Sequence, residues 1–172
     1  MWLSTGEMAK GLRLLLFLAI LGPGTAGAAG PTDIVRVDDY IGAPRALFGR
    51  TGAEVELALG PPHQTASGAV ATYRDPAVFR STRRLSYPGL VIDVPATGRV
   101  RRVRIAGSGR ALPFGLDVGS PREEVERVLG EAQESADSHL MYLYSDGYPE
   151  TVHFHLREGR VREIEWNFGS AE

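Results

Sequence analysis

Residues 121–130, PREEVERVLG, decide how the rest of the chain is interpreted. Ser120 and Glu123 have the spacing of a capping box, and the proline between them is well tolerated at the first helical position. Gly130 is a helix-terminating glycine. The apolar residues of this stretch recur at i, i+3 and i+4 and therefore share one helical face: Val125, Val128 and Leu129. The stretch predicts a short amphipathic helix whose apolar face must be covered by another element.

A second version of this pattern lies at residues 51–60, TGAEVELALG. Thr51 and Glu54 form another capping box, and Gly60 precedes two prolines that prevent the helix from continuing. We therefore predict a helix over residues 52–59. Its apolar residues match those of the later helix with a constant shift of 70 positions: Val55 with Val125, Ala58 with Val128, and Leu59 with Leu129.

The segments that follow the two helices also match, in the same order. ATYRD (71–75) corresponds to YLYSD (142–146), YPGLVIDV (87–94) to YPETVHFH (148–155), and GRVRRVRI (98–105) to GRVREIEW (159–166). The offset between matched residues falls from 71 positions at Tyr73 and Tyr144 to 61 at Tyr87 and Tyr148. The first copy therefore has ten extra residues, which lie within 76–85. Matched blocks in one order predict an internal duplication.

Each copy is expected to contain a helix followed by short antiparallel strands joined by tight turns. The predicted fold class is α+β, with two tandem repeats that each pack a short helix on an antiparallel β-sheet. The predicted organisation is a signal peptide over 1–28, repeat unit one over 29–106 and repeat unit two over 107–172. We expect the two sheets to lie side by side, and the sequence leaves open whether they merge. Upstream, 34–37 favours an edge strand or a lead-in arm, and 43–49 a short helix.

The N-terminus has the plan of a secretory signal. Lys10 and Arg13 precede an apolar run over 14–21, and the small residues AGA at 26–28 follow. We expect cleavage to leave a mature chain that begins near Ala29. The alternative is a retained membrane anchor, but the apolar run is short for crossing a bilayer. The expected location is periplasmic or secreted.

Composition excludes several classes of protein. The chain has no cysteine, which excludes disulfides, cysteine zinc sites and lipid attachment at a processed cysteine. Its formal net charge of -2 gives no general attraction for nucleic acid or acidic lipid. Contact with a membrane would therefore need an uncleaved signal or a partner.

Two histidines in VHFH share a strand face, because His153 and His155 are two residues apart. Two imidazoles at this spacing can share a metal ion. The third ligand would come from one of four side chains: His63, His139, Asp146 or Glu150. Ile92 and Val94 stand at the matched places of the first copy. The simpler interpretation is an exposed strand face that carries two histidines, so we predict no metal site and no cofactor.

The basic segment RVRRVR (99–104) has an acidic counterpart in the second copy. Glu163 and Glu165 stand where the first copy has Arg102 and Arg104. The two arms are expected to pair as opposite charges across the two copies. The alternative is a basic arm that meets phosphate or acidic lipid headgroups.

Aromatic residues gather in the second copy, and they are the candidates for protein binding. They would be binding anchors on an exposed sheet face, or packing residues in the core. The candidates are Tyr142, Tyr144, Tyr148, Trp166, Phe168, Tyr73 and Tyr87. The chain has no Gly-x-Ser-x-Gly elbow and no phosphate-binding loop, so we assign no catalytic residue and expect a protein that is not an enzyme.

The pattern E-V-x-x-x-L-G, followed by a tyrosine-bearing strand and then by G-R-V, resembles the SmpA/OmlA (BamE-type) envelope module. The closest stretch is LPFGLDVGSPREEVERVLG at 112–130, and the resemblance covers about 48–168. Two such units in tandem are similar in plan to the β-lactamase-inhibitor-protein fold. This chain departs from those families in lacking the lipid-bearing cysteine and the disulfides. The resemblance implies a protein-binding module of the bacterial cell envelope, an assembly accessory or an inhibitor-like protein. The alternative is a metal-dependent or hydrolytic envelope enzyme.

Overall fold

The computed structural model describes residues 29–71, 79–146 and 149–169, without the side chains of 69–71, 79 and 80. Within these residues the fold is α+β, as predicted, and the chain forms three α-helices, one 3-10 turn and eight strands. In chain order the elements are α1 Ile34–Phe48, α2 Gly52–Leu59, β1 Gln64–Ala71, β2 Phe79–Tyr87, β3 Leu90–Pro95, β4 Arg102–Ile105, η1 Pro113–Gly115, α3 Arg122–Leu129, β5 Glu134–Ala136, β6 His139–Leu143, β7 Thr151–Arg157 and β8 Arg160–Asn167.

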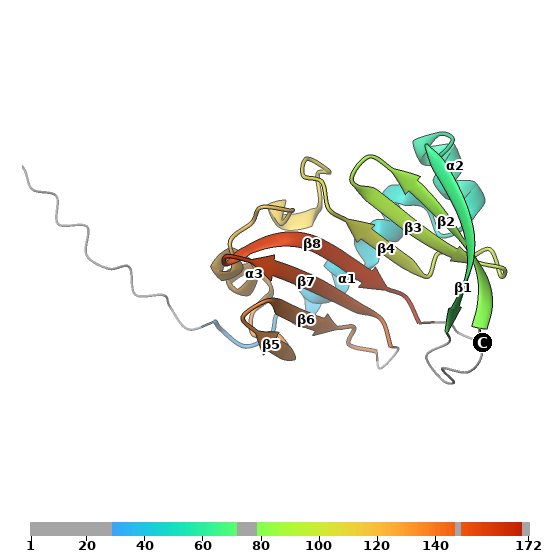
Figure 1. Ribbon diagram of the computed structural model, residues 1–172. Coiled ribbons are helices and arrows are strands. Elements are labelled where there is room, and N and C mark those ends of the chain that lie inside the picture. Colours follow the sequence, from blue (N-terminus) through green and yellow to red (C-terminus); the bar gives the residue numbers. More distant parts are fainter. Residues whose placement is uncertain (1–28, 72–78, 147–148, 170–172) are drawn as a thin grey trace, which may run out of the picture.

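All eight strands belong to one antiparallel sheet, in the order β1-β2-β3-β4-β8-β7-β6-β5 (Figure 1). The centre of the sheet is the pairing of β4 with β8, in which Arg104 lies opposite Glu165. The strands of the two predicted units therefore merge into one continuous sheet. The predicted adjacency of the basic arm and the acidic arm is confirmed by this central pair of strands.

Helix α2 has the bounds predicted for residues 52–59. The Thr51 hydroxyl accepts a hydrogen bond from the backbone N–H of Glu54 at 3.3 Å. The Glu54 carboxylate in turn accepts from the backbone N–H of Arg50 at 2.6 Å. The predicted cap is therefore present, although the glutamate reaches one residue further back than in the usual capping box.

Helix α3 begins differently from the prediction. Pro121 is the N-cap and makes no side-chain cap, so the predicted capping box of Ser120 and Glu123 is wrong. The Ser120 hydroxyl instead accepts from the backbone N–H of Asp117 at 3.1 Å. Pro121 forms an isolated antiparallel bridge with Arg160, which holds this segment against β8. The bridge keeps Pro121 extended, so the helix starts one residue later.

The predicted strand or arm near 34–37 is wrong, whereas the helix predicted over 43–49 is present as the last part of α1, which ends at Phe48 before the C-cap Gly49. The two stretches form the single 15-residue helix α1, which begins at the N-cap Asp33. The carboxylate of Asp33 accepts from the backbone N–H of Arg36 at 3.2 Å. The alternation of apolar residues near 34–37 was too short to distinguish strand from helix.

Pro44 lies inside α1 and leaves one helical carbonyl without its usual donor. The carbonyl of Tyr40 would accept from the backbone N–H of residue 44, and proline has none. The indole Nε1 of Trp166 on β8 donates to this carbonyl at 3.0 Å. The Tyr40 ring also stacks on Trp166 and on Phe154, with centroid distances of 5.5 Å to each. The proline is therefore accommodated by a donor from the sheet.

The helices cover only one face of the sheet. Alternate strand residues on that face are fully buried, for example Ile92, Val103 and Phe154, and they join α1, α2 and α3 in one hydrophobic cluster. Figure 1 views the sheet from the other side, with α1 passing behind the strands. The opposite face is left without a covering helix among the described residues.

The described part of the chain contains no helix long and apolar enough to cross a membrane. The predicted signal peptide over 1–28 lies outside the described residues and stays a prediction. The boundary between the two predicted units, at 106 and 107, also stays a prediction.

The role of the Trp166 indole can be tested by a double-mutant cycle. We expect Trp166→Phe to lower the free energy of unfolding by about 2–4 kcal/mol, because a buried acceptor is left unsatisfied and the smaller ring leaves a cavity. Pro44→Ala restores a backbone N–H for the Tyr40 carbonyl, so Trp166→Phe should cost about 1 kcal/mol less in that background. Urea unfolding of the four proteins measures the coupling. Purely additive costs would contradict this role.

Candidate functional site

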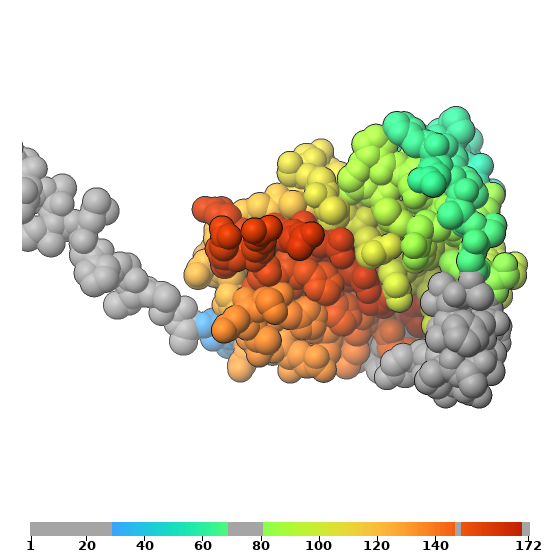
Figure 2. Space-filling view, in the orientation of Figure 1, coloured from blue at the N-terminus to red at the C-terminus, as the bar shows by residue number. Residues whose placement is uncertain are grey.

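The uncovered face of the sheet is polar and carries most of the ionisable strand residues. We define it by the side chains that alternate with the buried ones: Arg84, Asp93, Arg102, Arg104, His139, Met141, Thr151, His153, His155, Glu163, Glu165 and Asn167. Figure 2 shows this side of the molecule, with the orange and red residues of β6, β7 and β8 forming one broad surface. Strand pairing arranges these side chains in rows that cross the sheet.

One row joins arginine and acid across the middle of the sheet. The Arg84 guanidinium donates to both oxygens of the Asp93 carboxylate, at 2.8 and 3.3 Å. Arg102 donates to the Asn167 amide oxygen at 3.0 Å and lies 3.6 Å from Glu165. The predicted pairing of opposite charges between the two arms is confirmed for Arg102 and Glu165. These contacts hold the side chains in place on an otherwise open surface.

Three histidines cluster at the end of the uncovered face formed by β6 and β7. His139 Nε2 and His153 Nδ1 are 2.9 Å apart, and the Thr151 hydroxyl lies 2.8 Å from His153 Nε2. The rings of His139 and His155 have centroids 5.4 Å apart. Partial burial, and then the neighbouring histidines, lower the pKa of His139 and of His153. These two imidazoles are therefore held in the neutral form at neutral pH.

His153 and His155 share one face, as predicted, but three of the four proposed third ligands lie elsewhere. His63 is paired through its backbone with Ser86, in the other half of the sheet. Glu150 is buried and bound by Arg45, which donates to it at 2.9 Å. Asp146 lies in the turn after β6. The fourth proposed ligand, His139, is the one that the structure brings next to His153.

The predicted match of Ile92 with His153 and of Val94 with His155 is out of register. Ile92 and Val94 are buried against the helices. His153 lies opposite Glu165 on the uncovered face. Because a shift of one residue moves a side chain to the other face of a sheet, the sequence match placed these pairs on opposite sides.

Two carboxylates that the sequence assigned to arginine pairing converge on His155. One ligand atom each from His155, Glu163 and Glu165 lies within 4.8 Å of the others, and all three side chains are partly buried. His155 is opposite Glu163 in the pairing of β7 with β8. The sequence showed that these polar residues recur at i and i+2 in each strand. It did not show the register between β7 and β8, which is what places Glu163 opposite His155.

The aromatic candidates for binding divide into core residues and partly exposed ones. Trp166 and Tyr142 are completely buried and Phe168 is nearly so, which corrects the expectation that they anchor a partner on an exposed face. They lie on the helix-covered side because they alternate with the polar residues of β6 and β8. Tyr87 and Tyr144 are half-buried against this core. The remaining candidates, Tyr73 and Tyr148, lie outside the described residues.

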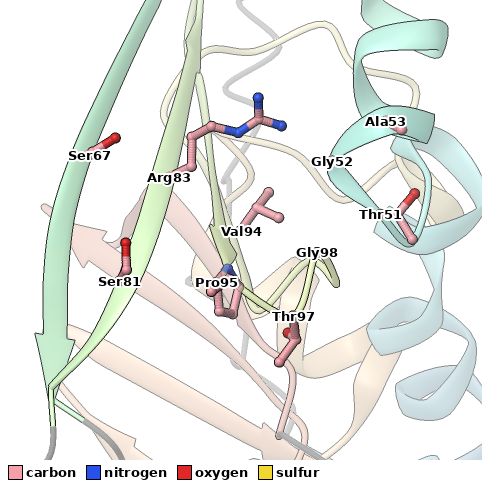
Figure 3. A pocket seen from close by; sticks show the side chains of 11 residues that line it. Thr51, Gly52, Ala53, Ser67, Ser81, Arg83, Val94, Pro95, Thr97 and Gly98 are labelled. Atoms are coloured by element: carbon pink, nitrogen blue, oxygen red, sulfur yellow. The ribbon is translucent and has the colours of Figure 1, made fainter.

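A shallow pocket of about 420 Å³ opens beside the N-terminus of α2, on the helix side of β2 and β3 (Figure 3). Its lining includes the hydroxyls of Thr51, Ser67 and Ser81. Arg83 is the single ionisable side chain of the lining, and it forms an ion pair with Glu56 at 3.0 Å. The pocket therefore brings no nucleophile together with a general base.

Comparison with known proteins finds no matching family model, curated protein or solved structure.

Tyr142 and Tyr87 make the same kind of hydrogen bond in different surroundings. Tyr142 donates to the Gly130 carbonyl at 3.0 Å, and Tyr87 donates to the Gly60 carbonyl at 3.1 Å. We expect Tyr142→Phe to lower the free energy of unfolding by about 1–2 kcal/mol, because its acceptor is left buried. Tyr87→Phe should cost less than about 1 kcal/mol, since water can reach its half-buried site. Urea unfolding measures both, and equal costs would argue against the assignment of Tyr142 to the core.

Proposed function

We propose that this chain is an exported, non-enzymatic protein-binding module of the bacterial cell envelope, and that it binds another envelope or secreted protein through the uncovered sheet face. The observation that carries the proposal is the one-sided covering of an eight-stranded sheet. The pairing of β4 with β8 joins the two halves of the sheet and makes this face broad. Ion pairs such as that of Arg84 with Asp93 hold its side chains in place. A broad, pre-ordered surface suits recognition of a folded partner.

The proposed fold is a tandem duplication of one unit, a helix with a four-stranded sheet. Hydrogen bonds repeated in both halves support it. The backbone N–H of Gly52 donates to Gly98 at 3.0 Å, and that of Arg122 donates to Gly159 at 2.9 Å. Both acceptors are the glycines of the two Gly-Arg-Val turns.

Further pairs of contacts repeat in the same way. The bonds made by Tyr87 and Tyr142 each end on the glycine that follows the short helix. The isolated bridge of Thr51 with Arg99 has its counterpart in that of Pro121 with Arg160. The repeated contacts support the proposed duplication and the resemblance to tandem envelope modules.

The chemistry of the uncovered face specifies the kind of partner. The face combines arginines and carboxylates with three histidines, and the largest aromatic candidates are buried on the opposite side of the sheet. We therefore propose recognition by charge and hydrogen bonding rather than by aromatic anchors. Exposed charges steer association and are screened by salt, so binding should weaken as ionic strength rises.

A photoreactive side chain can test which face binds. Met141 is partly exposed on the uncovered face, whereas Leu57 on α2 is 89% exposed on the helix side and serves as the control. We expect a photoreactive residue at 141, but not at 57, to give a defined adduct with a protein of the envelope extract. Added salt should reduce the adduct. Adducts from position 57 alone, or none from 141, would refute binding through the sheet face.

Export has its own test. The proposal requires cleavage near Ala29, so the protein recovered from the periplasm or the medium should begin at or close to that residue. N-terminal sequencing measures this. Recovery of intact residues 1–28 on a membrane-bound protein would favour the retained anchor instead.

The alternative is a metal-dependent envelope enzyme, and one observation favours it. His155, Glu163 and Glu165 are potential metal ligands on an accessible face. A metal ion with an open coordination position can activate water. The alternative can be tested by assaying the purified protein for hydrolytic activity in the presence of Zn²⁺. Hydrolytic activity that is lost in Glu163→Gln would replace the binding proposal.

A further inference from the structure

We propose that His155, Glu163 and Glu165 bind one divalent transition-metal ion of the Zn²⁺ class on the uncovered face of β7 and β8. This site does not depend on the proposed protein-binding function, because it rests on three side chains and not on a partner. A metal site and a protein-binding face can each exist without the other.

Strand pairing brings the three ligands together. His155 and Glu163 are direct partners in the antiparallel register of β7 and β8, and Glu165 follows two residues later on the same face. Their ligand atoms already lie within 4.8 Å of one another. Zinc binds imidazole nitrogen and carboxylate oxygen at about 2.0–2.2 Å, so modest rotation of these partly exposed side chains closes the site.

The charges at the site favour a cation. Glu163 and Glu165 direct two carboxylates at the same space. Arg102 lies 3.6 Å from Glu165 and Arg104 stands opposite it on β4, so Glu163 is the carboxylate without a counter-charge among the described residues. The Glu163 side chain forms no hydrogen bond or ion pair within the described residues. A divalent ion would neutralise both carboxylates.

Supporting contacts hold one of the ligands in position. The Asn167 amide donates to Glu165 Oε1 at 2.9 Å, and Arg102 lies 3.6 Å from the same oxygen. Glu165 therefore keeps its second oxygen for the metal. Metal-ligating carboxylates are commonly oriented by hydrogen bonds of this kind.

The donor set selects the kind of metal. Imidazole nitrogen favours Zn²⁺, Cu²⁺, Fe²⁺ or Ni²⁺, whereas Mg²⁺ and Ca²⁺ prefer sites made only of oxygen. Three protein ligands leave a fourth position for water in a tetrahedral zinc site. His139 is not counted as a ligand, because its Nε2 is engaged with His153 at 2.9 Å.

Isothermal titration of ZnCl₂ into the purified protein tests the site. We expect one ion per chain, and affinity for Mg²⁺ at least about a hundredfold weaker. Glu163→Gln removes the ligand charge with little change of shape and should weaken Zn²⁺ binding at least about tenfold. Glu123→Gln, an exposed glutamate on α3, is the matched control and should bind as the wild type does. Circular dichroism confirms that each variant is folded.

A second pair of variants separates this site from the neighbouring histidines. His155→Gln should weaken binding as Glu163→Gln does, whereas His139→Gln should leave the stoichiometry at one and change the affinity less than about threefold. The proposal is overturned if the wild type binds no Zn²⁺ at one per chain, or if Glu163→Gln binds like the wild type. It is also overturned if His139→Gln abolishes binding, since the ion would then lie between His139 and His153.

Discussion

The hydrogen bond from the Trp166 indole to the Tyr40 carbonyl determines how the helical layer meets the sheet. Pro44 removes the donor that this carbonyl would have in an uninterrupted helix, and the carbonyl lies in the core, where water does not replace it. A donor from β8 must therefore approach the middle of α1. Because β8 pairs with β4 at the centre of the sheet, the bond anchors α1 across the join between the two halves.

Strand alternation then fixes which side chains reach the uncovered face. In β7, Val152, Phe154 and Leu156 are buried, so His153 and His155 must point the other way. A slip of one residue would place two imidazoles in the core and three apolar side chains in water, which makes the register strongly specified. The polar cluster is thus a consequence of core packing on the opposite face, and it does not require a helix or a loop to position it.

The sequence predicted the elements with strong local signals and failed where tertiary contacts decide. The bounds of α2, the antiparallel sheet and the pairing of the two charged arms follow from capping, alternation and charge. The full extent of helix α1 was missed, because the proline inside it is accommodated by a donor 126 positions away in the chain. The burial of Tyr142 and the convergence of Glu163 on His155 could not be predicted, since both depend on the register between strands and on the face that α1 covers.

The two halves of the uncovered face differ in a way that explains where a metal ion would bind. Strand pairing gives the row Arg84, Asp93 and Arg102 in the first half and the row His139, His155 and Glu163 in the second. Under the proposed duplication these rows are equivalent. In the first, both oxygens of the Asp93 carboxylate accept from the Arg84 guanidinium. In the second, His139 stands in the place of Arg84, and the Glu163 side chain forms no ion pair within the described residues. The two rows therefore differ at all three positions: histidines stand where the first row has Arg84 and Asp93, and Glu163 stands where it has Arg102, which gives the second row the imidazole and the carboxylate of a ligand set.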